Sequence, residues 1–244
     1  MRRTNRRRDC MEPLYLTSVT CICCEAEYQS SRVRPSFKKA SSRDSDFCAH
    51  FKSEINPDYY VVRVCPKCGF ASTENSAEQL SDAQKKLYYD RIGMHWVVRD
   101  YGGSRTQDQA LECYKFALIC AQVIGDKERV IAGILHHIAW IYRYKEQTEQ
   151  ELRFLRFALG AYVRVYETEG VDLNNAKLMF LIGELHRRLG EPIDAVRWFS
   201  RVVNDKKITD GSMIRASREQ WQLLRLENAG NTDFIDGVQA KINA

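Results

Sequence analysis

Two pairs of cysteines, Cys21-Ile-Cys-Cys24 and Cys65-Pro-Lys-Cys68, constrain this chain more than any other feature. A thiolate is a soft anionic donor, and Zn²⁺ binds four such donors in a tetrahedron. Two intervening residues let one tight turn present both sulfurs to the same ion, and Gly69 suits the positive φ with which such a turn often ends. The spacing predicts a zinc site with Cys21, Cys24, Cys65 and Cys68 as its ligands.

Other cysteines and one histidine are weaker candidates. Cys48 and His50 lie in the polar stretch between the two pairs, and either is a possible alternate ligand or a group that orients the ligands from outside. Cys113 and Cys120 are seven residues apart on one face of a predicted helix, so we expect them in the core. Four thiolates leave zinc no open position for water, so the predicted site is structural rather than catalytic.

The positive charge of the chain is concentrated in its first third. The net charge is +5, and residues 1–70 hold 13 Lys and Arg against 8 Asp and Glu. Residues 1–13 are predicted to be a disordered basic tail, with Met11 as an alternative start of translation. No apolar run reaches the roughly 18 residues of a membrane span, and the basic start lacks the apolar segment of a secretory signal. The cysteines therefore indicate a reducing, cytoplasmic setting.

The sequence pattern changes at about residue 76. Residues 14–76 are interpreted as a zinc-ribbon-like domain with a long insert, in which Leu14–Thr20 and Tyr59–Val64 are predicted strands. Apolar residues then recur at helical spacing, which predicts a helical-repeat domain at 77–230 and a tail at 231–244. The predicted class is α+β, mostly α. The seven predicted helices span residues 78–101, 106–124, 127–146, 149–168, 173–189, 192–204 and 212–229.

These helices also repeat, and the segment from Leu178 to Phe199 resembles a tetratricopeptide repeat. Such helix pairs cannot bury their apolar faces alone, so we expect them to stack into a curved antiparallel array. The spacings between copies exceed the usual repeat of about 34 residues, which predicts longer helices. The matching positions in the three copies are Val98, Ala139 and Gly183, followed further along by Tyr114, Leu155 and Phe199.

In such arrays the first helix of each pair lines a concave groove. The predicted lining is basic with aromatic members, and we expect it to bind an acidic peptide or the C-terminal carboxylate of a partner protein. Guanidinium groups pair bidentately with carboxylates, and Arg and Tyr are enriched where peptides are held. The alternative is that the charges are solvated and the aromatic residues belong to the core. The predicted lining residues are His95, Arg99, His136, Trp140, Arg143, Tyr144, Lys177, Phe180, Glu184, Arg187 and Arg188.

Several motifs occur together in this chain. They are Val19-Thr-Cys21 with Cys24, Asp44-Ser-Asp-Phe-Cys48, Asn56-Pro-Asp-Tyr-Tyr60, Val64-Cys-Pro-Lys-Cys-Gly-Phe-Ala71, and Val130-Ile-Ala-Gly through Ile138-Ala-Trp-Ile-Tyr-Arg143. With them, the chain from Met11 onward resembles a bacterial family known as domain of unknown function 2225. The resemblance implies a zinc-ribbon-like head, a helical-repeat body and no established activity. Family members tend to have Cys-Pro-x-Cys at the first pair, so the additional Cys23 leaves open which two sulfurs bind there.

The leading functional hypothesis is a non-enzymatic, zinc-binding scaffold that binds protein through the helical groove. The first alternative is a nucleic-acid-binding protein that uses the basic residues of the head. The second is an enzyme that uses Asp44, Asp46, His50 and the metal, although the two aspartates are more simply interpreted as turn or helix caps. The basic residues of the nucleic-acid hypothesis are Arg32, Arg34, Lys38, Lys39 and Arg43.

Overall fold

The computed structural model describes residues 12–170, 175–231 and 234. The chain divides into two compact units. The first unit holds the residues up to Arg43 together with Ala49–Asp126, and the second holds Asp44–Cys48 together with the residues from Lys127 onward. The predicted basic tail lies almost entirely outside the described residues, as does most of the predicted C-terminal tail.

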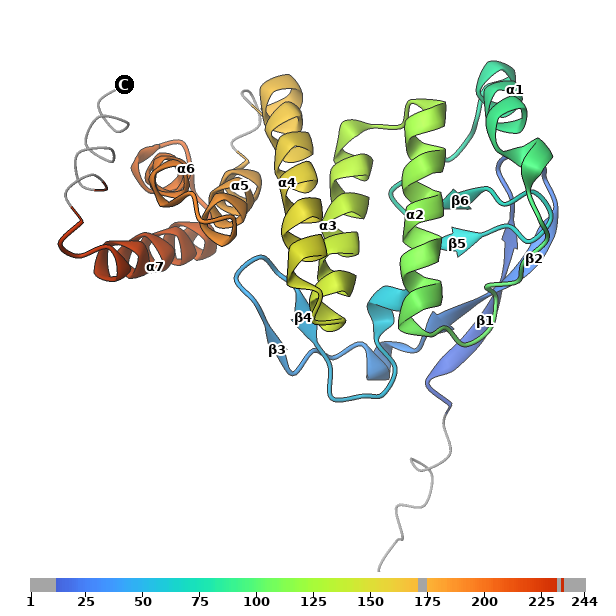
Figure 1. Ribbon diagram of the computed structural model, residues 1–244, viewed down its shortest axis with the longest axis horizontal. Helices are drawn as coiled ribbons and strands as arrows, with labels where there is room; N and C mark the ends of the chain where they lie inside the picture. Colours follow the sequence, from blue (N-terminus) through green and yellow to red (C-terminus); the bar gives the residue numbers. More distant parts are fainter. Residues whose placement is uncertain (1–11, 171–174, 232–233, 235–244) are drawn as a thin grey trace, which may run out of the picture. The chain divides into compact units, whose positions relative to one another are not determined.

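The first unit contains three short antiparallel strand pairs (Figure 1). β1 (Leu14–Thr20) pairs with β2 (Glu27–Val33), so that Leu14 faces Val33 and Thr20 faces Glu27. β3 (Ser42–Arg43) pairs with β4 (Ala49–His50), and β5 (Arg63–Val64) pairs with β6 (Ala71–Ser72). Two 3₁₀ turns, η1 (Pro35–Phe37) and η2 (Pro57–Tyr60), lie between these pairs. The β1–β2 and β5–β6 pairs each carry one cysteine pair in their connecting turn.

The predicted strand at Tyr59–Val64 is shorter than expected. Pro57–Tyr60 forms η2 instead, because the Asn56 side chain accepts a hydrogen bond from the Asp58 backbone N–H at 2.9 Å and starts a turn. The buried Arg105 then binds the carbonyl oxygens of Tyr59 and Val62 at 2.9 and 2.7 Å. Those carbonyls are therefore satisfied by a side chain, and β5 begins only at Arg63.

Two helices complete the first unit, α1 (Asp82–Arg91) and α2 (Gln107–Ile124). A helix was predicted over 78–101, but α1 starts at a capping box between Ser81 and Gln84 and is followed by the 3₁₀ turn η3 (Gly93–His95). The chain then leaves helical geometry as the Trp96 indole donates a hydrogen bond to the Pro66 carbonyl at 2.8 Å. Val98, the first position of the predicted repeat, is consequently outside any helix and 74% exposed.

α2 contributes the two cysteines that were predicted to lie in the core. Cys113 and Cys120 are 0% and 2% exposed, which confirms the prediction. The Cys120 sulfur accepts a hydrogen bond from the Ala71 backbone N–H at 3.4 Å. α2 therefore packs directly against β6, beside the second cysteine pair.

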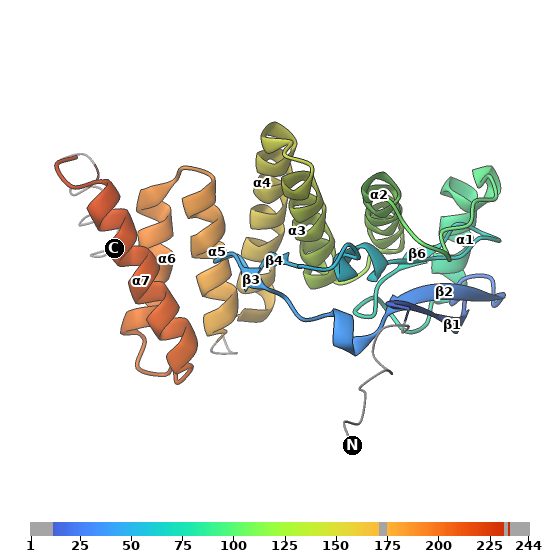
Figure 2. The same ribbon diagram turned by 90° about the horizontal axis from the view of Figure 1, so that it is seen from below.

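The second unit is built from antiparallel helix pairs. α3 (Glu128–Tyr144) pairs with α4 (Thr148–Val165), which continues into the π-helical turn η4 (Tyr166–Gly170). α5 (Ala176–Arg188) pairs with α6 (Pro192–Asn204), and α7 (Gly211–Glu227) packs on both of them (Figure 2). The two later copies of the predicted repeat thus each form a helical hairpin.

Small residues allow close helix crossing in the α5–α6 hairpin. A Cβ atom at Gly183 would lie only 2.8 Å from Cε1 of Phe199 and 3.1 Å from Cβ of Trp198. Phe199 and Ala195 are fully buried at this crossing. Gly183, one of the matching positions of the predicted repeat, must therefore be small because it contacts the return helix.

None of the helices in the described part of the chain is both long and apolar enough to cross a bilayer.

The close helix crossing predicts that replacing two glycines by alanine has opposite effects on the free energy of unfolding. Gly183→Ala would force a methyl group against Phe199, and such overpacking typically costs about 1–3 kcal/mol of the free energy of unfolding. Gly133→Ala in α3 is the matched control, because nothing lies within 4 Å of the position that its methyl group would occupy. It should stabilise the protein by up to about 1 kcal/mol through helix propensity. Urea unfolding measures both; equal effects would contradict the close crossing.

Candidate functional site

The first cysteine pair forms a tight turn between β1 and β2. The Cys21 backbone N–H donates to the Ala26 carbonyl, and the Glu25 N–H donates to the Cys21 carbonyl, both at 2.9 Å. Glu25, the residue after Cys24, has a positive φ of 60°. The turn therefore closes on the first cysteine and presents the sulfurs of both.

The second cysteine pair forms an equivalent turn between β5 and β6. The Cys65 N–H donates to the Phe70 carbonyl at 2.9 Å, and the Gly69 N–H donates to the Cys65 carbonyl at 2.8 Å. Gly69 has φ +77°, as expected from the sequence. It is also close to Trp96, because a Cβ at Gly69 would collide with the indole ring. The two turns thus share one geometry, although 41 residues separate Cys24 from Cys65.

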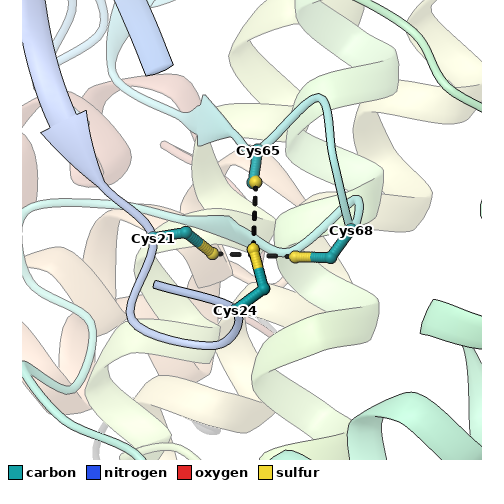
Figure 3. Close-up of side chains that lie close together, drawn as sticks. All are labelled: Cys21, Cys24, Cys65 and Cys68. Carbon is teal, nitrogen blue, oxygen red and sulfur yellow. Dashed lines mark hydrogen bonds between the residues drawn. The ribbon is translucent and has the colours of Figure 1, made fainter. Parts of the chain in front are cut away.

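The four sulfurs come together between the two turns (Figure 3). The Sγ atoms of Cys21 and Cys68 are 3.6 Å apart, as are those of Cys24 and Cys65. All four lie within 4.8 Å of one another. A zinc ion bound by four thiolates at about 2.3 Å requires sulfur–sulfur separations of about 3.8 Å. These four cysteines therefore lie close enough to bind one metal ion, and their donor chemistry fits zinc.

Metal binding at this cluster would require the four thiols to release their protons. A hydrogen bond with Cys68, together with burial, raises the pKa of Cys21 well above its ordinary 9.0, and burial raises the pKa of Cys65 to about 11. Crowded, buried thiols resist ionisation one by one, whereas a divalent cation neutralises them together. Metal affinity should consequently fall as the pH falls, since the protons compete for the same sulfurs.

Residues from outside the turns hold the second turn in place. The Tyr88 hydroxyl on α1 donates to the Cys68 carbonyl at 2.7 Å, and its ring packs edge-on against Phe70 with centroids 5.0 Å apart. Trp96 binds the Pro66 carbonyl in the middle of the same turn. Sequence reasoning missed both residues, because their sequence separation from the turn leaves no local signal.

The weaker ligand candidates lie in different places. Cys23 is buried in the first turn and contacts Cys68, so its role at the metal stays a prediction. His50 is in β4, where its carbonyl accepts hydrogen bonds from the backbone N–H and hydroxyl of Ser41. Cys48 belongs to the second unit, where its thiol donates to the Tyr144 hydroxyl at 3.4 Å and burial raises its pKa to about 12. Neither Cys48 nor His50 belongs to the group of four mutually close sulfurs.

A second cluster lies in the second unit around Asp46, whose side chain is 0% exposed. Arg143 binds this carboxylate with two bonds, at 3.0 Å to Oδ1 and 2.7 Å to Oδ2. The Trp140 indole donates to Oδ2 at 3.2 Å, and His136 Nε2 lies 3.4 Å from the same oxygen. Arg188 approaches Oδ1 to 3.4 Å. A buried carboxylate is therefore held by groups from α3 and α5.

The neighbouring residues of the segment Asp44–Cys48 bind the same helices. Asp44 accepts from Arg143 at 2.7 Å, and the Ser45 hydroxyl donates to Glu184 at 2.6 Å. Glu184 is itself buried and paired with both Arg187 and Arg188. We call the helical side of this contact the arginine surface. It consists of His136, Trp140, Arg143, Tyr144, Glu184, Arg187 and Arg188.

Nine of the eleven predicted groove residues, all on α3 and α5, contact this segment or border it. Lys177 places its Nζ 4.9 Å from the centre of the Phe47 ring, and Phe180 packs on the same ring at 5.8 Å. His95 and Arg99 belong to the first unit, beyond the end of α1, where Arg99 pairs with Glu112 at 2.5 Å. Because α1 ends at Arg91, neither residue is part of the long helix predicted over 78–101, and their part in binding a partner stays a prediction.

The two aspartates are more than turn caps. Asp46 does accept from the Cys48 backbone N–H at 3.4 Å, but its shortest bonds go to Arg143. Burial alone would raise the pKa of Asp46, yet hydrogen bonds from His136 and Arg143 and the charge of Arg188 hold it well below its ordinary 3.8. Burial lowers the pKa of His136 despite the neighbouring carboxylate. Asp46 is therefore ionised at neutral pH and unsuited to general acid catalysis.

The family model for an uncharacterized protein conserved in bacteria (DUF2225) matches residues 14–224. The chain belongs to this family. The match spans both the cysteine turns and the helical hairpins, as the motif resemblance indicated. Neither a curated protein nor a solved structure matches the chain.

Some of the basic residues of the nucleic-acid hypothesis interact with other residues of the chain. Arg32 forms an ion pair with Glu74. Arg34 donates to the Glu12 carbonyl at 2.9 Å and lies over the Tyr15 ring at 5.3 Å. Lys38, Lys39 and Arg43 are exposed. Arg32 in β2 and Arg34 directly after it thus stabilise the local fold of the first unit.

The buried pair of Asp46 and Arg143 predicts that the free energy of unfolding falls at acid pH. A carboxyl group whose folded-state pKa is depressed adds stability above its unfolded pKa, and that stability is lost as the pH falls through 3.8 toward the folded-state value. Asp46→Asn should cost about 3–5 kcal/mol at neutral pH, because it leaves a buried guanidinium without its main partner. The difference between wild type and variant should shrink below about pH 4.

Urea unfolding followed by tryptophan fluorescence at several pH values measures this difference. Asp90→Asn, at an exposed position on α1, is the control and should change little. A pH-independent gap between Asp46→Asn and wild type would contradict the assigned charge state.

Proposed function

We propose that this protein is a zinc-stabilised, non-enzymatic scaffold whose arginine surface binds an acidic segment of a partner protein. The observation that carries the proposal is that Arg143 binds the carboxylate of Asp46 with two hydrogen bonds. Asp46 lies in an irregular segment rather than in a helix. Bidentate guanidinium–carboxylate pairing is a recurrent means of recognising acidic peptides. The surrounding aromatic and arginine residues are of the types that carry binding energy at interfaces.

The charge balance of the arginine surface supports an anionic occupant. Arg143, Arg187 and Arg188 face Glu151 and Glu184, with Glu151 accepting from Arg143 at 2.7 Å. Among these five side chains one positive charge is left over. The segment Asp44–Cys48 supplies two carboxylates here, those of Asp46 and Asp44, and both accept from Arg143.

Zinc supplies stability rather than chemistry in this proposal. When bound, the ion would cross-link the two turns through Cys21, Cys24, Cys65 and Cys68, and four protein ligands make a closed, structural site. The turns themselves contribute the geometry, through the residues of positive φ that follow Cys24 and Cys68. The enzymatic alternative is weak because Asp46, its proposed acid or base, is neutralised by Arg143.

Metal content tests the first part of the proposal. Purified protein should contain one zinc ion per chain, measured by plasma mass spectrometry. Cys65→Ser should lose most of that zinc and unfold at a lower temperature, because metal binding contributes directly to folding. Cys113→Ala, a buried cysteine outside the four-sulfur group, should keep it. Equal zinc in both variants, or none in wild type, would refute the metal site.

Arginine dependence tests the second part. Wild-type protein should capture a protein from its own cytosol, and the double variant Arg187→Ala and Arg188→Ala should capture it at least tenfold less. The control is Arg215→Ala with Arg218→Ala, two exposed arginines of α7, and it should behave as wild type. Capture should weaken with salt, since the arginines are partly exposed. Unchanged capture by the double variant would exclude the arginine surface as the binding site.

A further inference from the structure

The segment Asp44–Cys48 has the form of a bound peptide. Its backbone closes on itself, with the Asp44 N–H donating to the Cys48 carbonyl at 2.8 Å and the Phe47 N–H donating to the Asp44 carbonyl at 2.9 Å. Phe47 has a positive φ of 71°. The turn is therefore closed by backbone hydrogen bonds within its own five residues.

Residues of the second unit contact consecutive side chains of this turn. Ser45 donates to Glu184, Asp46 enters the arginine surface, and the Cys48 thiol donates to Tyr144. Phe47 packs against the cluster that includes Phe180, Ala195 and Phe199. An aspartate followed directly by an aromatic residue thus has two adjacent complementary sites, one charged and one apolar.

The contact combines a buried centre with an accessible edge. The Asp46 side chain is fully buried, whereas those of Arg143, Arg187 and Arg188 are 14%, 25% and 19% exposed. Arg43 and Ala49, on either side of the segment, belong to the first unit. In sequence, the segment is therefore a short piece of the second unit between two stretches of the first, and the arginines at its edge are partly exposed.

From this arrangement we infer that the arginine surface recognises peptides in which an aspartate is followed directly by an aromatic residue, and that Asp44–Cys48 is an attached ligand which a partner of this chemistry replaces. The inference rests on the proposed function and specifies its partner. An attached competitor acts at an effective concentration on the order of millimolar. A partner therefore binds the wild-type chain weakly until the attached segment is released.

A dye-labelled peptide that copies residues 42–49, with Cys48→Ser to prevent oxidation, provides the probe. Fluorescence anisotropy should show that the full chain carrying Phe47→Ala binds this peptide at least tenfold more tightly than wild type, because the attached competitor is weakened. The full chain carrying Phe157→Ala should bind as wild type does, since Phe157 is an exposed aromatic residue of α4. A peptide carrying Asp46→Asn should not bind any of the three chains.

Equal binding of the probe by all three chains would overturn the inference, and so would absence of binding to a folded Phe47→Ala chain. Circular dichroism establishes whether that variant is folded. If it is not, hydrogen exchange on the wild-type chain gives the decision. Excess probe should accelerate exchange of the Asp44–Cys48 amides at least several-fold, whereas the Asp46→Asn peptide should not. Unchanged exchange would overturn the inference.

The outcomes separate the inference from the proposed function. If the probe fails while capture still depends on Arg187 and Arg188, the partner is recognised by other chemistry and only the inference falls. If capture is also independent of those arginines, the proposed function falls as well.

Discussion

The carboxylate of Asp46 has no exposed surface, and an ionised carboxylate without partners would be very costly in such a place. Arg143 offsets that cost with two charge-assisted hydrogen bonds, and Trp140 adds a third donor. Once Asp46 is fixed there, the positions of Ser45 and Phe47 follow from the tight turn that contains them. A buried ion pair of this kind contributes less to net stability than to the uniqueness of one arrangement. We therefore infer that the main role of this pair is to fix the segment in one arrangement.

The cysteine cluster solves a related problem in the first unit. Its strands are short, and β5 and β6 have only two residues each, so strand pairing alone offers little cooperativity. Four converging sulfurs join two turns that lie far apart in the sequence, and Tyr88 anchors the second turn to α1. Metal coordination can supply the cross-link that so small a β region lacks.

Features with a local cause could be predicted from the sequence. Cysteine spacing and Gly69 identified the turns, and apolar periodicity located the later helices to within a few residues. Features set by distant partners could not. The predicted strand at Tyr59–Val64 was too long because Arg105 captures its carbonyls, and the first helix was too long because Trp96 binds Pro66. Each of these partners lies about 30 or more residues away in sequence.

The arginine surface illustrates both what the sequence could predict and what it could not. Helix phase placed Arg143, Glu184 and Arg188 on one side of the array, and their chemistry indicated an acidic occupant. The sequence also contained that acidic segment, in the motif Asp44-Ser-Asp-Phe-Cys48. Nothing local connects the two, because Asp46 and Arg143 are 97 residues apart. Combining a basic predicted groove with an acidic motif elsewhere in the same chain would have suggested the pairing.

A double-mutant cycle on Asp46 and Arg143 tests the central claim most directly. Urea unfolding at neutral pH of wild type, Asp46→Asn, Arg143→Gln and the double variant yields the coupling free energy. We expect at least about 2 kcal/mol, as for residues in one buried network. The exposed pair Arg129–Glu169, whose side chains are 46% and 38% exposed, should give less than about 1 kcal/mol. Additive effects at Asp46 and Arg143 would contradict the claim that this carboxylate is bound by this guanidinium.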